Sequence, residues 1–265
     1  MKILITLFLM FTLSYSKVYY AKVEPYELRD IASNVSGLVL FIDEDKIGKK
    51  LSSKAYIRID SELDSKELIF IEEKLTYLNE IVKVNADVLK NLDKSLTRKR
   101  ENYKRIEGLK FKSVVEKDRE YHELVSSENS YLNTQKEIQN LNVQIADLKL
   151  RKAHLKRSVK DKNISNKGFV LYEILVKVGQ VVGISTPLAK VADTSRAKLT
   201  IYLDEVDVAS AKNKIVYING EKTSYKVSRT LNIADSKNIS KYMAQVIIKS
   251  PKLFSKLVTV ELKDK

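Results

Sequence analysis

The chain has 265 residues, and its composition of 44% hydrophobic and 31% charged residues is typical of a folded protein rather than a disordered one. The absence of cysteine excludes disulfides, thiolate catalysis, thiolate metal sites and an acylated N-terminal cysteine. With 7 Gly and 3 Pro, the sequence is too poor in turn residues for an all-β protein of this size, so we expect long helices. The formal net charge of +14 leaves nucleic acid, anionic lipid and acidic proteins open as partners, because basic and acidic residues are interleaved along the chain.

The first residues form the pattern of a signal peptide. Lys2 is followed by an apolar run from Ile3 to Leu13 and then by Ser14-Tyr15-Ser16, a small-x-small cleavage pattern. We expect an exported protein with residues 1–16 as its signal peptide, and cleavage either after Ser16 or after Ala21. The apolar run is shorter than the roughly 20 residues that span a bilayer, and a retained anchor is the alternative.

A long helix is predicted from residue 61, capped by Asp60 or Ser61. Its evidence is a row of mostly apolar residues at alternating spacings of four and three, which is a coiled-coil seam. The row consists of Ile71, Leu75, Leu78, Val82, Asn85, Leu89, Leu92, Leu96, Lys99, Tyr103 and Ile106. We expect this helix to stop at Gly108, where a positive φ is easily adopted.

A second helix follows a tight tip over residues 108–113. Ser113 and Glu116 have the spacing of a capping box, in which each side chain binds the other residue's backbone N–H. One apolar stripe comprises Tyr121, Val125 and Leu132, and a second comprises Ile138, Leu141, Ile145, Leu148, Leu155 and Val159. The change of phase between the stripes predicts a local change in the winding of the coiled coil. The short tip makes the two helices antiparallel, so the ends of the hairpin at residues 61 and 162 should meet.

The segments that flank the hairpin are related to each other. Gly37-Leu38-Val39-Leu40-Phe41 up to Gly48 matches Gly168-Phe169-Val170-Leu171-Tyr172 up to Gly179, which indicates an internal repeat. Each copy is too short to bury a core alone. We therefore expect the two copies, brought together by the hairpin, to form a small β-sandwich of interlocked halves.

Beyond residue 193 the apolar residues alternate with polar ones, which predicts strands. The predicted strands are 199–203, 215–218, 225–227, 244–248 and 257–262. Asn219-Gly220 is a strong signal for a β-hairpin turn, and about five strands suit a small barrel or sheet.

With these segments in order, the sequence resembles the HlyD-type periplasmic adaptors, or membrane fusion proteins, of tripartite efflux pumps and type I secretion systems. The resemblance rests on residues 31–39 leading to Gly48, on residues 168–191 and on residues 199–207. It implies an α+β fold in which a long antiparallel coiled-coil hairpin is inserted in a split lipoyl-like β-sandwich, followed by a small β-barrel domain. The expected segments are residues 22–60 and 163–193 for the lipoyl half-motifs, 61–162 for the hairpin and 194–265 for the barrel.

The resemblance also implies a function. Adaptors of this family form a homo-oligomer, a hexameric ring, in the periplasm of Gram-negative bacteria, and they link an inner-membrane transporter to an outer-membrane channel. We expect the family's membrane-proximal domain to be absent here, which makes residues 199–265 the expected transporter contact.

At the hairpin tip, pump adaptors of this family commonly carry an Arg, a Leu four residues later and a Ser seven residues after that. The same spacing falls here on Asn102, Ile106 and Ser113, so the fixed cation is replaced by an amide. Arg105 offers a nearby charge, out of register. The expected channel-binding residues are therefore Asn102, Arg105, Ile106, Leu109 and Ser113. An N-cap alone is the alternative role of Ser113.

No catalytic constellation is visible, and we expect neither an enzyme nor a cofactor. His122 and His154 are separated by about 48 Å on a straight helix at 1.5 Å per residue, so they do not share a site. Lys66 and Lys162 lie beside the hairpin rather than on a tight turn, which argues against a lipoylated or biotinylated carrier. The alternative function is an exported structural coiled coil that binds anionic surfaces or self-assembles. Nucleic-acid binding ranks third, because no groove-reading motif is present.

Overall fold

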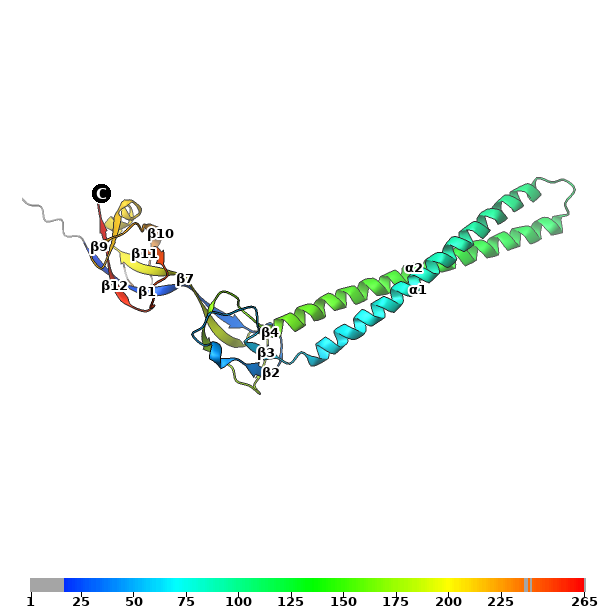
Figure 1. Cartoon of the computed structure of the whole chain (residues 1–265). Helices are drawn as coiled ribbons and strands as arrows, with labels where there is room; N and C mark the ends of the chain where they lie inside the picture. Colours follow the sequence, from blue (N-terminus) through cyan, green and yellow to red (C-terminus); the bar gives the residue numbers. More distant parts are fainter. Residues whose placement is uncertain (1–16, 236–237, 239, 265) are drawn as a thin grey trace, which may run out of the picture. The chain divides into compact units, whose positions relative to one another are not determined.

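The computed structural model describes residues 17–235, 238 and 240–264 (Figure 1). The chain divides into two compact units. The β unit comprises the described residues up to 33, residues 41–57 and the described residues from 165 onward, and the hairpin unit comprises residues 34–40 and 58–164. The mixed fold with a long helical hairpin and β-sheet domains confirms the expected class.

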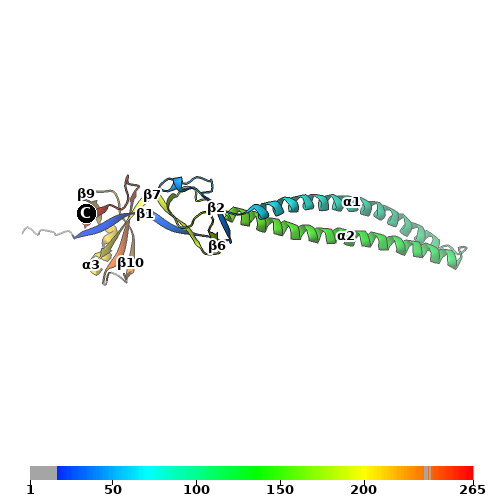
Figure 2. The ribbon, with the colours of Figure 1, turned by 90° about the horizontal axis from the view of Figure 1, so that it is seen from below.

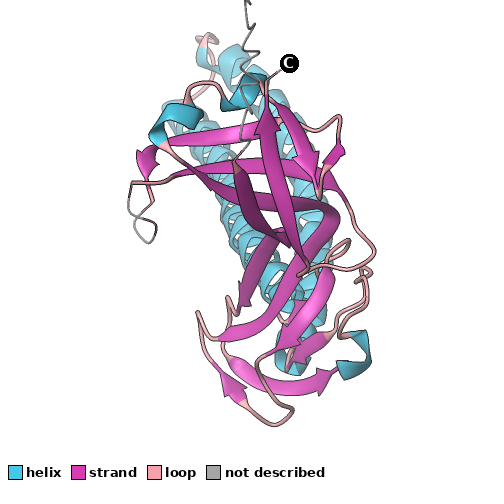
Figure 3. Ribbon diagram, turned by 90° about the vertical axis from the view of Figure 1, so that its left-hand side faces the viewer, coloured by secondary structure: helices cyan, strands magenta, loops and turns pink. Residues whose placement is uncertain are grey.

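Two long strands organise the β unit. β1 (Val18–Ala32) pairs antiparallel with β7 (Pro187–Leu203), from Val23 opposite Leu199 to Ala32 opposite Pro187. The first five residues of β1 pair instead with β12 (Leu257–Lys263), and the second half of β7 pairs with β11 (Tyr242–Lys249). Figure 3 shows the strands in magenta. Each long strand therefore pairs with different strands along its length.

The remaining strands of this sheet extend it on both sides. They are β5 (Val170–Ile174), β8 (Ile215–Ile218), β9 (Glu221–Lys222) and β10 (Val227–Ala234). The strand order is β10-β11-β7-β1-β12-β8-β9, with β5 paired to β7. The main core of the unit contains Val23, Leu199, Ile201, Leu203, Val216, Ala244, Val246 and Val260.

Four of the five strands predicted beyond residue 193 lie where the alternation places them. The third is displaced, because β10 begins at Val227 and runs to Ala234. The Asn219-Gly220 hairpin is confirmed: both residues have positive φ, 52° and 82°, and Ile218 pairs with Glu221 across the turn. The short connection after β7 contains α3 (Glu205–Val208) and a 3₁₀ turn at Ala211–Asn213. The expected boundary at residue 193 falls inside β7.

The two copies of the internal repeat meet within the β unit. Gly48 N–H donates to Leu171 O at 2.8 Å, Leu51 N–H donates to Phe169 O at 2.7 Å, and Gly168 N–H donates back to Leu51 O at 3.0 Å. Gly48 and Gly179, which are equivalent in the repeat, have φ of 77° and 84°, so the same left-handed turn recurs in both copies. The contact between the repeats is therefore backbone pairing between sequence-distant segments. A 3₁₀ turn at Glu44–Lys46 and strand β6 (Val181–Val182) complete this region.

The hairpin unit consists of α1 (Glu62–Glu107) and α2 (Val114–Asp161), which run alongside each other in Figures 1 and 2. Every residue of the predicted α1 seam is buried or partly buried, whereas the residues around it are mostly exposed. Ile71, Leu75 and Leu78 of α1 form a buried cluster with Leu141 and Ile145 of α2. The antiparallel hairpin is thus confirmed.

At the root of the hairpin the chain returns to its starting point. Ile59 N–H donates to Lys162 O at 2.8 Å, and Asp60 N–H donates to Leu38 O at 2.8 Å. These contacts accompany β2 (Gly37–Ile42), β3 (Ile57–Ile59) and β4 (Asn163–Ile164), with β3 lying between the other two. The Asp60 carboxylate accepts from Glu62 N–H at 3.0 Å and so caps α1.

Three details of the hairpin differ from expectation. Gly108 does end α1, but with a right-handed φ of −76°, so the predicted positive φ is wrong. Leu132 is 51% exposed and does not belong to a packed stripe. The partly buried positions of α2 instead continue through Tyr131, Thr134 and Ile138, so the predicted change of phase is wrong as well. Packing against α1 keeps the buried face of α2 in a single heptad phase, even where that phase places polar residues in the seam.

The expected signal peptide, residues 1–16, lies outside the described residues. The nearby alternative cleavage point at Ala21 lies inside β1, where Ala21 is 2% exposed. Among the described residues, no helix is both long enough and apolar enough to span a bilayer.

The packing at Gly37 yields a prediction about stability. A Cβ at Gly37 would lie 2.6 Å from Ile59 Cγ2, and Ile59 is 1% exposed with a stiff β-branched side chain. We expect Gly37→Ala to lower the free energy of unfolding by about 1–3 kcal/mol through overpacking, as measured by urea denaturation. Gly108→Ala is the control, because its Cβ meets nothing closer than a backbone oxygen at 4.0 Å. Equal stabilities of the two variants would contradict the close packing at the hairpin root.

Candidate partner-binding surfaces

The tip of the hairpin is fixed by the capping box at the start of α2. The Ser113 hydroxyl accepts from Glu116 N–H at 3.3 Å, and the Glu116 carboxylate accepts from Ser113 N–H at 3.1 Å. Hydrogen bonds from Ser113 and from Lys112 hold the pKa of Glu116 below its ordinary value. The predicted capping role of Ser113 is confirmed, and its proposed channel contact stays a prediction.

The other expected tip residues lie on the end of α1 and in the turn. Arg105 donates to the Asn102 side chain, so the nearby cation is bound to the amide that stands where the family commonly has Arg. Ile106 is partly buried in the α1 seam, and its carbonyl accepts from Leu109 N–H at 3.0 Å. Asn102 and Arg105 are therefore available at the surface, while Ile106 and Leu109 are partly covered.

The most exposed apolar side chains of the tip are ones that the spacing pattern did not select. Phe111, Val114 and Val115, which we call the tip patch, are 80%, 73% and 77% exposed. Val114 and Val115 open α2, although β-branched residues are poor helix formers. The sequence does contain a signal for the patch. Apolar residues in a tight turn, and at the exposed first positions of a helix, have no core to pack against. Exposed apolar clusters of this kind mark interaction sites.

Basic residues border the tip patch. Lys112 pairs with Glu116 at 3.2 Å, and Lys117 donates to the carbonyl of Glu107, the last residue of α1, at 2.9 Å. The Lys117 ammonium thereby satisfies a carbonyl that the helix end leaves open. The Lys117 contact joins α2 to the end of α1 next to the patch, whereas the Lys112 pair is local to the start of α2.

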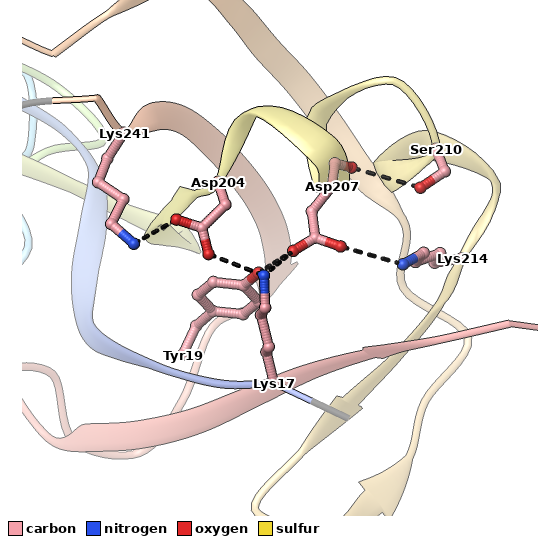
Figure 4. A network of polar contacts seen from close by, with 7 residues as sticks. All are labelled: Lys17, Tyr19, Asp204, Asp207, Ser210, Lys214 and Lys241. Carbon is pink, nitrogen blue, oxygen red and sulfur yellow. Dashed lines mark hydrogen bonds and ion pairs between the residues drawn. The ribbon is translucent and has the colours of Figure 1, made fainter. Parts of the chain in front are cut away.

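A second polar cluster lies in the β unit, where the beginning of β1 meets α3 (Figure 4). Lys17 Nζ lies 2.9 Å from Asp204 Oδ2 and 3.1 Å from Asp207 Oδ2. The Tyr19 hydroxyl donates to Asp207 at 2.9 Å, and Asp207 also pairs with Lys214 at 3.4 Å. Lys241 pairs with Asp204. We call Lys17, Tyr19, Asp204, Asp207, Lys214 and Lys241 the Asp204/Asp207 network.

The network stabilises the ionised carboxylates. Hydrogen bonds from Lys241 and Lys17 lower the pKa of Asp204 to about 2. Burial opposes ionisation of Asp207, yet hydrogen bonds from Tyr19 and Lys17 outweigh burial and hold the pKa of Asp207 below its ordinary value. The network therefore acts as an anchor that ties the first residues of β1 to the rest of the β unit.

The described residues contain no group of three or more His, Asp or Glu side chains that could hold a metal ion. The tip presents exposed apolar side chains next to charged ones.

Comparisons with known proteins identify the fold. No protein-family model and no curated protein sequence matches the chain. Among solved structures, MacA from Actinobacillus actinomycetemcomitans matches with a TM-score of 0.67 and 17% identity, over 93% of this chain and 78% of that one. A MacA-MexA chimera containing the α-hairpin domain of Pseudomonas aeruginosa MexA matches with a TM-score of 0.54 and 14% identity, over 94% of this chain and 81% of that one.

The membrane fusion protein Spr0693 from Streptococcus pneumoniae R6 matches with a TM-score of 0.52 and 13% identity, over 94% of this chain and 100% of that one. The chain thus has the fold of periplasmic adaptors and membrane fusion proteins. The resemblance indicated by the sequence is confirmed at the level of the fold.

The Asp204/Asp207 network predicts a loss of stability in acid. Because the folded pKa values lie below the ordinary 3.8 of Asp, the stabilisation is complete above about pH 4 and is lost as the pH falls toward 2. We expect the urea midpoint of the β unit to fall over this range, and Asp207→Asn to lower the midpoint at pH 7 and flatten its fall. Glu205→Gln, which changes an acid next to the network, is the control. A wild-type midpoint that is constant between pH 4 and 2 would contradict the anchoring role.

Proposed function

We propose that this protein is a periplasmic adaptor subunit that links an inner-membrane transporter to an outer-membrane channel for efflux or secretion. The observation that carries the proposal is the hairpin itself. It closes on backbone hydrogen bonds at its root, between Ile59 and Lys162, and ends in the exposed apolar tip patch. The fold shared with MacA and Spr0693 supports this role. The proposal gives the chain no catalytic step and no cofactor.

The tip is the proposed contact with the channel. The tip patch offers apolar area, and Asn102 and Arg105 offer hydrogen-bond donors on the same end of the hairpin. Because Arg105 is already bound to Asn102, the contact depends more on the burial of Phe111, Val114 and Val115 than on a free cation. Ser113 fixes the backbone at the start of α2 through its capping box, and Ile106 and Leu109 are partly buried beside the turn.

The β unit is the proposed contact with the transporter, and the protein is proposed to act as a homo-oligomer, a hexameric ring. Tyr20 and Leu257 lie on the paired strands β1 and β12 and are 67% and 70% exposed. Large apolar side chains on the solvent face of a sheet are candidates for a protein interface. They give residues 199–265 and the beginning of β1 a surface with which to bind a membrane-embedded partner.

On export to the periplasm, residues 1–16 are either removed as a signal peptide or retained as an anchor. We propose that they are removed by cleavage after Ser16. Cleavage after Ala21 would remove four of the five β1 residues that pair with β12, namely Val18 to Ala21. It would also remove Tyr19 of β1 and Lys17, which directly precedes β1, and both of these residues bind Asp207. The alternative cleavage point would therefore dismantle part of the folded β unit.

This proposal predicts the mature N-terminus. We expect intact-mass measurement of the exported protein to give a chain beginning at Lys17, because that chain retains all of β1. Ser16→Arg should block the processing, since a small residue is needed immediately before the cleaved bond. A mature chain beginning at Lys22 would contradict the proposal, and an unprocessed chain would instead indicate a retained anchor.

The channel contact is tested by photo-cross-linking in intact cells. A photoreactive residue in place of Phe111 is expected to capture an outer-membrane channel protein, whereas the same residue in place of Lys90, exposed on the side of α1, is not. Phe111→Asp is expected to reduce transport by about tenfold or more, because it puts a charge into an apolar contact, without changing helix content by circular dichroism. Capture from position 90 alone, or wild-type transport by Phe111→Asp, would refute docking through the tip patch.

A further inference from the structure

The outer face of the β unit carries a pocket that the proposed function does not use. Its volume is about 370 Å³, within the range of about 300–1,000 Å³ that is typical of small-molecule sites. Strands β7 and β11 form its floor, where Lys198 lies opposite Ile247 and Gln245 follows two residues away. Their neighbours Leu199 and Val246 belong to the buried core, so the floor residues lie on the opposite face of the sheet.

A β-bulge on β10 forms one wall of the pocket. Val227 pairs with Val246 and Arg229 pairs with the preceding residue, Gln245, so the ladder advances two residues on β10 and one on β11. Ser228 and Arg229 are successive residues that both line the pocket, whereas in a regular strand they would point to opposite faces. Bulges re-aim side chains in this way and are over-represented at functional sites.

A second shift of register, on β1, forms the other wall. Pro25 pairs with Ala197 and Glu27 pairs with Asp193, so the ladder advances two residues on β1 and four on β7. Tyr26 and Glu27 are successive residues, and both line the pocket. The two walls belong to strands that are separated in the sheet by β11 and β7. Two independent irregularities therefore direct side chains to the same place.

The pocket has two cations without an acidic partner. Glu27 is the carboxylate of the β1 wall, and its two oxygens accept from Arg29 at 2.6 and 2.8 Å. The hydrogen bond from Arg29 holds the pKa of Glu27 below its ordinary value, so this carboxylate is ionised and already paired. Within the described residues, the side chains of Lys198 and Arg229 form no ion pair, and this includes Glu24, which lies opposite Lys198 in the ladder. The pocket therefore keeps a net positive charge.

Aromatic and apolar groups adjoin these cations. The Arg196 guanidinium lies 3.9 Å from the centroid of the Tyr26 ring and fixes that ring in the wall by a cation–π contact. Ile247 supplies an aliphatic side chain in the floor. The Ser228 hydroxyl donates to the Gln245 carbonyl at 2.9 Å, which holds the bulge against β11. The pocket thus combines unpaired positive charge with apolar contact area.

We propose that this pocket binds a small organic anion, in which a carboxylate or phosphate group is attached to an apolar body. Lys198 and Arg229 bind the anionic group, because Lys and Arg form strong charge-assisted hydrogen bonds with both kinds of anion. The apolar body packs on Ile247 and on the Tyr26 ring. A neutral ligand would leave both cations unpaired, and a bare inorganic anion would leave the apolar groups uncovered. The inference goes beyond the proposed function, because it depends on the β unit and on neither the hairpin nor its partners.

Calorimetric titration of the exported protein with defined probes tests the chemistry of the ligand. We expect phenyl phosphate or phenylacetate to bind, and benzyl alcohol, which lacks the anionic group, to give no measurable binding. Inorganic phosphate and acetate lack the ring and should bind about tenfold more weakly or less, because they bury no apolar surface. Failure of both aromatic anions to bind would overturn the proposal. Equal binding of benzyl alcohol or of the ring-free anions would do the same.

Charge variants assign the binding to this pocket. Lys198→Gln and Arg229→Gln are each expected to weaken the affinity for the bound probe by about tenfold or more, because each removes a charge-assisted contact. Lys222→Gln is the matched control, since Lys222 is an exposed lysine on β9, at the far end of the strand order from β10. It should bind the probe as the wild type does. Full affinity in both pocket variants, or an equal loss in the control, would refute the site.

A spectroscopic measurement on the wild-type chain locates the ligand without any variant, so it is decisive even where Lys198→Gln destabilises the fold. Titration with the bound probe is expected to shift the backbone amide NMR signals of Ser228, Gln245 and Ile247. The amide signal of Lys136, on α2, is the internal reference and should not move. Shifts confined to the hairpin unit would show that the probe binds elsewhere and would contradict the proposal.

Discussion

The antiparallel return of the hairpin is the constraint on which the rest of the structure depends. Burial of Ile71, Leu75 and Leu78 against Leu141 and Ile145 holds the two arms in register, and the Ile59–Lys162 hydrogen bond closes their root. Repeat segments that are more than 100 residues apart in sequence can then pair through Gly48, Leu51 and Phe169. The chain has few glycines and prolines, and the segment between the two repeats is helical. Bringing its ends together therefore costs less conformational entropy than closing a flexible loop of the same length would.

The predictability of the fold follows from how local each interaction is. The α1 seam could be predicted residue by residue, since the spacing of four and three is a property of one helix. β1 could not: it contains Pro25, which argues against a central strand, and its partners in β7 lie about 170 residues away. The structure accommodates Pro25 next to a shift of register between Pro25 and Glu27. At the tip, the capping box was predictable from the spacing of Ser113 and Glu116, whereas the family spacing selects Asn102 and Ile106 and does not include the tip patch.

The same logic explains why the second helix was harder to interpret. α2 has apolar residues on two opposite faces, with Leu141 and Ile145 inward and Val143 and Leu150 outward. A sequence pattern alone does not tell which of two apolar faces packs against α1. The predicted change of phase arose from treating Leu132 as part of the inner stripe. Its exposure of 51% instead groups it with Val143 and Leu150.

The tip illustrates how one interaction can replace another. A fixed cation at the position of Asn102 would give a directional, salt-sensitive contact, whereas here Arg105 is bound to that amide and Phe111, Val114 and Val115 present apolar area. Apolar burial is non-directional and is less sensitive to ionic strength. In the proposed role as an adaptor, a tip of this kind would keep contact with its partner through small rotations. The capping box at Ser113 then supplies the rigidity that the apolar contact lacks.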